Sequence, residues 1–185
     1  MLMYIKHTFK FIDENIFLML YKTLVRPHLE FASTVWSPHH KYNIDAIERV
    51  QRRATKMLAT LQDLSYSQRL EKLKLETLEY RRRRADLLET YRIMNGVHNI
   101  DQSCYCSLCP GKQMFPASLA QTTRGHQMKV QIQHATGGRQ HYFSSRVAHL
   151  WNNLSPNTIN SKNINIFKNN LSHELTNKYN YKFSY

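Results

Sequence analysis

The clearest pattern in the chain is a segment from Asn43 to Leu61, in which apolar residues recur every three or four positions. At about 100° per residue they fall within an arc of roughly 140°, and four basic residues fall on the opposite side. The apolar positions are Ile44, Ile47, Val50, Ala54, Met57, Leu58 and Leu61, and the basic positions are Arg49, Arg52, Arg53 and Lys56. Burial of the apolar arc orients a helix more strongly than exposed ion pairs do. We therefore predict one amphipathic helix with an outward basic face, and a hydrogen-bond partner for Gln51 at the edge of the arc.

Two helical segments are expected before this helix. Asp13 fits the N-cap of the first, which Pro27 should stop, because proline disfavours the α conformation in the residue before it. Apolar residues from 28 to 36 are spaced for a short buried helix. We expect Trp36 and Tyr21 to be core residues rather than a platform for stacked bases, since aromatic residues at helical spacing usually bury their large area.

Two further helices are predicted after the amphipathic segment. Ser65 and Gln68 have the spacing of a capping box, and Thr77 can cap a helix that runs from Leu78 to Met94. Asn95-Gly96 then supplies a left-handed stop.

The run of arginines at positions 81–84 covers most of the circumference of that helix. At least one of them must therefore lie near the edge of the core. The others form either a solvated face or a second surface for phosphates, and the sequence does not decide between these readings. Arg82 and Arg83 are the candidates for this second surface.

From residue 97 onward the helical periodicity is lost, and a loop is expected. The alternating pattern of residues 130–133 predicts a short strand, and helices are expected at 141–152 and 163–175. The predicted fold class is mainly α. Residues 1–97 are expected to form a small helical domain, residues 98–135 a linker, and residues 136–185 a helical C-terminal extension.

The charge of the chain points to a polyanionic partner. The 185 residues include 26 Lys and Arg against 13 Asp and Glu, a formal net charge of +13. Nucleic acid is the partner that we favour; an anionic membrane surface and simple solubility are the alternatives. No signal peptide or apolar stretch of membrane-spanning length is visible in the sequence. We therefore expect an intracellular protein, nuclear or cytoplasmic, without a membrane partner.

One cysteine cluster has spacing suited to half of a zinc site. Cys106 and Cys109 are separated by two residues, and Cys104 and His126 are the further candidate ligands. A second close pair of ligands is missing, so we favour reduced loop cysteines and expect no cofactor.

Signals for catalysis are absent from the sequence. It has no pair of aspartates within an apolar strand to hold two magnesium ions, no glycine-rich phosphate loop and no nucleophile elbow. His39 and His40 follow a proline in a turn, where adjacent histidines are usually solvated. We expect a protein that is not an enzyme.

Six separated motifs resemble the C-terminal region of reverse transcriptases from non-LTR retrotransposons (LINE-type elements) of the jockey and CR1 type. They are FKFID at 9–13, FLMLYKTLVRPHLEFASTVWSP at 17–38, IERVQRRATK at 47–56, LEYRR at 78–82, TRGH at 123–126, and YFSSR with LWNNL at 142–154. The resemblance implies a helical thumb that lies along a template–primer duplex, followed by a C-terminal extension. The Tyr/Phe-Ala-Asp-Asp catalytic box of this family does not occur in the sequence, so polymerase activity is not implied.

These observations favour a non-catalytic, RNA-directed DNA polymerase fragment that contacts nucleic-acid backbones, as DNA, RNA or a hybrid. The expected phosphate contacts are Arg49, Arg52, Arg53, Lys56, Arg82 and Arg83. The alternative is a protein-interaction module, or the remnant of a decayed element, whose apolar helix faces dock on a polymerase palm or another protein.

Overall fold

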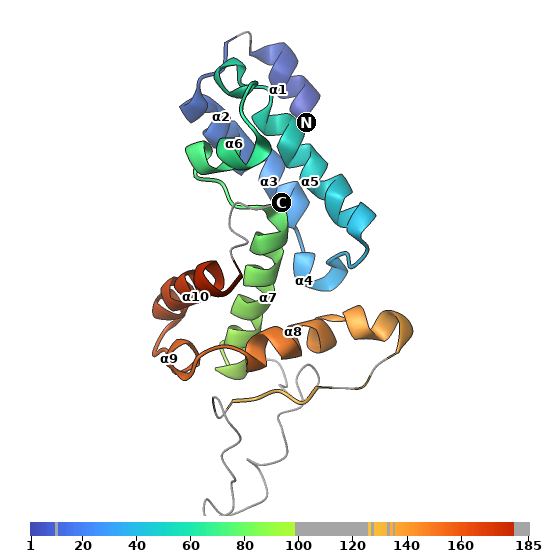
Figure 1. The fold of residues 1–185 in the computed structure, drawn as a ribbon, viewed down its shortest axis with the longest axis vertical. Coiled ribbons are helices and arrows are strands. Elements are labelled where there is room, and N and C mark those ends of the chain that lie inside the picture. The colour runs from blue at the N-terminus through green and yellow to red at the C-terminus, as the bar shows by residue number, and fades with distance from the viewer. Residues whose placement is uncertain (10, 99–125, 127, 133, 135, 180–185) are drawn as a thin grey trace, which may run out of the picture. The chain divides into compact units, whose positions relative to one another are not determined.

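The computed structural model describes residues 1–9, 11–98, 126, 128–132, 134 and 136–179, and these are mainly helical (Figure 1). The predicted fold class is therefore confirmed. The chain divides into two compact units, Met1–Arg82 and Arg83–Lys178, which are described in turn. The helices are α1 (Leu2–Thr8), α2 (Glu14–Leu20), α3 (Arg26–Glu30), α4 (Ser33–Trp36), α5 (Lys41–Thr55), α6 (Tyr66–Leu73), α7 (Leu78–Met94), α8 (Phe143–Asn152), α9 (Pro156–Ile159) and α10 (Ile164–Tyr179).

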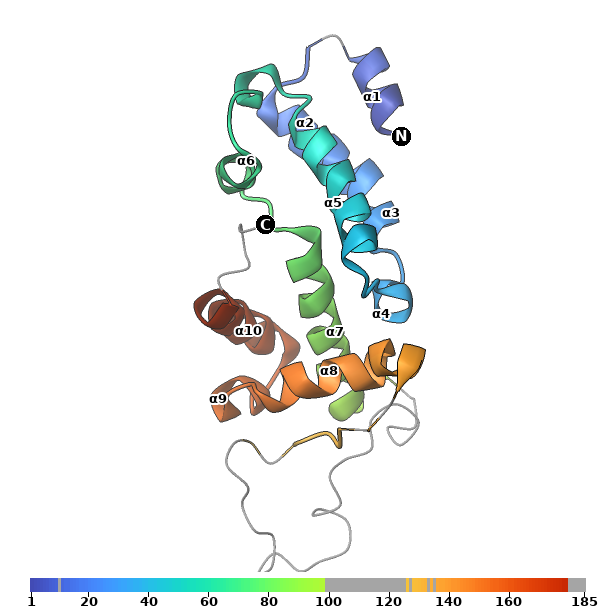
Figure 2. The same cartoon turned by 45° about the vertical axis from the view of Figure 1, so that its right-hand side comes forward.

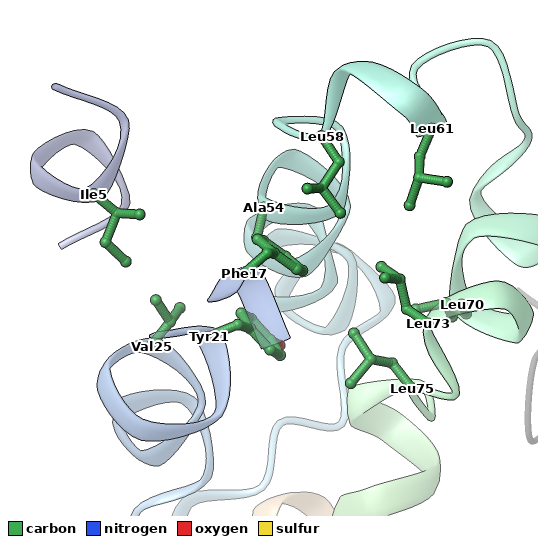
Figure 3. Packing of buried hydrophobic residues seen from close by; sticks show 10 residues of the cluster. All are labelled: Ile5, Phe17, Tyr21, Val25, Ala54, Leu58, Leu61, Leu70, Leu73 and Leu75. Atoms are coloured by element: carbon green, nitrogen blue, oxygen red, sulfur yellow. The ribbon is translucent and has the colours of Figure 1, made fainter. Parts of the chain in front are cut away.

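The core of the first unit gathers apolar side chains from several helices (Figure 3). Phe17 and Tyr21 stack with their ring centroids 5.8 Å apart. The buried members of this cluster are Ile5, Phe17, Tyr21, Val25, Ala54, Leu58, Leu61, Leu70, Leu73 and Leu75. Tyr21 is thus a core residue, as predicted. Of the apolar positions predicted for α5, Ala54 is buried in this core, whereas Ile44, Ile47 and Val50 are only partly buried.

Local capping signals are also confirmed. The Asp13 side chain accepts the Ile16 N–H at 2.7 Å, and Ser65 and Gln68 form both bonds of the capping box. The Tyr80 N–H donates to the Thr77 hydroxyl at 3.2 Å. At the end of α7, Gly96 has a positive φ of 65°, which a residue without a Cβ adopts at little cost.

The prediction that Pro27 ends the first helix is wrong. The helical path continues from α2 through a π-helical turn at Tyr21–Val25 into α3, where Pro27 lies in the first turn. Within the π-helical turn the Arg26 N–H bonds to the carbonyl of Tyr21, five residues back. Proline is tolerated in a first helical turn, because an N–H at that position has no partner within the helix.

The expected buried helix at residues 28–36 is wrong as well. The chain makes α3 and the four-residue helix α4, joined at Ala32 with a positive φ of 50°. Phe31 is 79% exposed, Val35 82% and Trp36 41%. The apolar spacing is present, but the described chain leaves most of Phe31 and Val35 uncovered and covers Trp36 only in part, so Trp36 is not a core residue.

The second unit is built by α8, α9, α10 and most of α7 (Figures 1 and 2). The Tyr91 ring stacks on Phe167 at 4.2 Å between centroids, and the Tyr91 hydroxyl donates to the Ser161 carbonyl at 2.6 Å. Arg146 of α8 donates two hydrogen bonds of 2.9 Å to the Asp86 carboxylate. Because α7 supplies these partners, its residues from Arg83 onward belong to the second unit.

The alternating segment at residues 130–133 does not form the predicted strand over its described residues. Val130 occupies only an isolated bridge position. The side-chain amide of Asn152 accepts the Val130 N–H at 2.9 Å and donates to the Val130 carbonyl at 2.8 Å. A side chain therefore takes the role that a neighbouring strand would have.

Candidate nucleic-acid interface

The helix that carries the predicted basic face is shorter than expected. The α5 helix ends at Thr55 with Lys56 as its C-cap, whereas one helix was predicted to reach Leu61. Leu58 adopts an extended conformation, and a 3-10 turn follows at Ala59–Leu61. This break lets Leu58 and Leu61 both enter the core. It also places Arg52, Arg53 and Lys56 at the C-terminal end of α5, where the helix dipole favours positive charge.

The buried edge of α5 is polar as well as apolar. Gln51 is buried and has the hydrogen-bond partners that its position requires. Its amide oxygen accepts the Tyr21 hydroxyl at 2.5 Å, and its amide nitrogen donates to the Tyr66 hydroxyl at 3.1 Å and to the Glu76 carbonyl at 2.9 Å. Gln51 thus links α5 to the π-helical turn, to α6 and to the segment before α7.

Glu48 lies beside Gln51 on the same edge and is fully buried, with 0% of its surface exposed. Its carboxylate accepts the Tyr66 hydroxyl, and at 3.0 Å the backbone N–H of Leu78, the first residue of α7. Burial raises the pKa of Glu48, while the two hydrogen bonds and the nearby Arg82 act in the opposite direction. Burial and the adjacent Glu48 charge raise the pKa of the Tyr66 phenol.

The sequence did not reveal this network, because Glu48 looked like an ordinary surface acid on a basic helix. Its position three residues before Gln51 was the available signal, since residues at that spacing share one helix face. The network fixes the rotation of α5 about its axis and so fixes which side chains point outward.

All four predicted basic residues of α5 are exposed: Arg49, Arg52, Arg53 and Lys56. The guanidinium of Arg52 lies 4.8 Å from the centre of the Tyr66 ring. Glu48 is the only acid between residues 46 and 56, and its charge faces inward. In the part of the chain that the structure describes, Arg49, Arg53 and Lys56 form no ion pair. We call Arg49, Arg52, Arg53 and Lys56 the basic face.

The arginines of α7 are placed differently. Arg81 donates to both carboxylate oxygens of Glu30, one at 3.0 Å, and to Glu76 at 3.2 Å. Arg82 is only 3% exposed, so it cannot meet a phosphate without leaving the interior, and we remove it from the candidate surface. Arg83 is half-buried and belongs to the second unit. The arginine run therefore mainly supports the fold, and of its two predicted phosphate contacts Arg83 alone keeps part of its surface exposed.

Of the four candidate zinc ligands, only His126 lies within the described residues. His126 is buried, and its Nε2 lies 3.0 Å from the Trp151 carbonyl oxygen. Cys104, Cys106 and Cys109 lie outside the described residues. Among the residues that are described, no group of three His, Cys, Asp or Glu side chains is arranged to hold a metal ion.

A bilayer-spanning segment was not expected. None of the helices within the described ranges is both long enough and apolar enough to cross a membrane.

Comparisons with known proteins give no assignment. No protein-family model, no curated protein and no solved structure matches this chain.

Proposed function

We propose that this chain binds nucleic-acid backbones through the basic face of α5, as a non-catalytic, thumb-like part of a reverse-transcriptase-related protein. The observation that carries the proposal is the exposure of all four cations of this face. The one acid between residues 46 and 56, Glu48, is buried, and Asp45, one turn before Arg49, pairs with Lys41 at 3.2 Å. The net charge of +13 and the resemblance of six sequence motifs to non-LTR reverse transcriptases support it.

The geometry of α5 suits a polyanion. At a rise of about 1.5 Å per residue, Arg49 to Lys56 covers roughly 10 Å of the helix. That length corresponds to about three base-pair steps of 3.4 Å. The hydrogen bonds of Gln51 and Glu48 hold the helix along its buried edge. The cations are therefore presented from a fixed support, and little backbone ordering is needed when a phosphate binds.

The test is the salt dependence of binding. Fluorescence anisotropy with a labelled duplex gives the slope of log K against log salt, to which each phosphate contact adds about −0.7 to −0.9. Replacing Arg49, Arg52, Arg53 and Lys56 with glutamine should flatten the slope by roughly three units. Circular dichroism should show an unchanged fold, since glutamine is nearly as good a helix former as arginine.

A matched control replaces as many exposed cations on other elements, namely Lys6, Lys22, Arg139 and Lys162, with glutamine. The control should keep most of the slope. Equal flattening in the two variants would mean that binding depends on diffuse charge, and the assignment to α5 would fail.

A second candidate function is protein docking, which the exposed apolar residues of the first unit favour. Phe11, Phe31 and Val35 are among its most exposed large side chains. Exposed apolar area of this kind occurs at protein contact surfaces. Light scattering after gel filtration tests this candidate: Phe31→Ser with Val35→Ser should shift an associating protein to its monomer mass and leave nucleic-acid binding unchanged.

A further inference from the structure

The turn between α4 and α5 displays four rings on the surface. Trp36 is 41% exposed and Tyr42 69%, and His39 and His40 between them are exposed too. The His39 and His40 rings lie 3.9 Å apart, and the His40 ring stacks on Tyr42 at 5.7 Å between centroids with an interplanar angle of 23°. We call Trp36, His39, His40 and Tyr42 the aromatic ledge.

The left-handed Ala32 and the Ser37-Pro38 turn explain why the ledge exists. Ala32, with φ 50°, starts the short helix α4, which ends at Trp36. The indole N–H of Trp36 donates to the carbonyl of Phe31, so the ring is held in place although the residue is partly exposed. Two residues after Pro38, His40 becomes the N-cap of α5.

The ledge continues into the basic face along one side of α5. Tyr42, Arg49 and Arg53 are separated by seven and four residues, so at about 100° per residue they fall within an arc of roughly 40°. Along the axis, Tyr42 lies about 10 Å before Arg49 and about 16 Å before Arg53. An exposed ring and phosphate-binding cations therefore share one stripe of one helix.

We propose that the aromatic ledge stacks on unpaired nucleobases, so that α5 prefers nucleic acid with a single-stranded segment over a fully paired duplex. This inference rests on the proposed function, because the basic face supplies the backbone contacts that bring a base to the ledge. Aromatic rings beside a cationic groove bind single strands of any sequence, since every base has a π face. A base inside a duplex is already stacked on its neighbours and cannot offer that face.

The experiment compares two labelled single strands of equal length and charge, one with thymine bases throughout and one with abasic sites at its central positions. The wild-type protein should bind the strand with bases about five- to a hundredfold more tightly. Tyr42→Ala should remove most of that preference and leave affinity for the abasic strand and the salt slope unchanged. Tyr42→Phe should restore the preference, because phenylalanine keeps the ring.

The matched control is Tyr142→Ala, which removes an exposed tyrosine of the second unit and should change neither affinity. If the wild-type protein binds the two strands with equal affinity and a steep salt slope, base stacking by the aromatic ledge is wrong, whereas phosphate binding by the basic face still holds. A Tyr42→Ala variant that loses affinity for both strands alike would also overturn base stacking. Whether the basic face binds phosphates is tested separately, by the salt slope of the glutamine variant of α5 and its control.

Discussion

The two arginine-rich helices of this protein use their positive charge in opposite ways. On α5, Arg49, Arg52 and Arg53 are exposed, and the buried edge is made of apolar residues with Glu48 and Gln51. On α7, Arg81 is tied to two carboxylates and Arg82 is buried. The first set lies on the surface of its helix, whereas the second set contributes to the packing of the protein.

The difference follows from the spacing of the arginines rather than from their number. On α5 the cations fall into one arc opposite the apolar residues, so burial of one side leaves all of them outside. Four consecutive residues spread over about 300° of a helix. Any packing of α7 must therefore bury an arginine from positions 81–84, and a buried guanidinium needs carboxylates and hydrogen-bond acceptors around it.

The largest expected effect is a difference in the free energy of unfolding between arginine variants of α7 and α5. Arg82→Ala should lower the free energy of unfolding by about 3–4 kcal/mol, because it leaves a cavity and removes a cation near the buried Glu48 carboxylate. Arg53→Ala should change it by less than about 0.5 kcal/mol. Urea unfolding followed by circular dichroism measures both. If the two variants unfold at the same denaturant concentration, the division between structural and surface arginines is incorrect.

A smaller expected effect tests whether a positive charge without the planar guanidinium group is sufficient at positions 81 and 49. Lysine keeps the charge of arginine but cannot donate to two carboxylates through a planar fork. Arg81→Lys should therefore cost about 1–2 kcal/mol, since the bonds to Glu30 and Glu76 are lost. Arg49→Lys should leave both stability and nucleic-acid affinity nearly unchanged. Thermal unfolding and anisotropy provide the readouts, and a tolerant Arg81→Lys would show that the fork geometry contributes little.

The smallest effect concerns pH and the buried edge of α5. Burial raises the pKa of Glu48 above its ordinary value of 4.5. The unfolded chain keeps the ordinary pKa, and the folded protein has the raised one. At a pH between the two, Glu48 binds more protons in the folded protein than in the unfolded chain. Glu48 therefore adds stability as the pH falls through this range. The difference in unfolding free energy between the wild-type protein and Glu48→Gln should therefore change with pH within this range. Parallel pH profiles would contradict a raised pKa at Glu48.

The sequence predicted the features that depend on neighbouring residues. Asp13, Ser65 and the Asn95-Gly96 stop are local signals, and each appears in the structure as predicted. The bounds of α7 were predicted at the observed residues, Leu78 and Met94. The outward direction of the basic face also followed from periodicity alone.

Features that depend on distant partners were not predicted. The burial of Glu48 requires Tyr66 and the start of α7, which lie 18 and 30 residues further along the chain. The exposure of Trp36 could not be predicted, because apolar spacing does not show whether another element covers a helix. Short helices such as α1 and α9 were missed, since a few residues carry too little periodicity to detect.

The two tryptophans give each unit its own optical reporter. Trp151 is completely buried in the second unit, whereas Trp36 lies on the surface of the first. An aqueous quencher such as iodide should reach Trp36 and spare Trp151 while the protein is folded. The difference between the tryptophan emission without and with iodide is then the emission of Trp36, which reports on the first unit. The melting of one unit can thus be followed apart from that of the other in the natural sequence, without a dye or an added label.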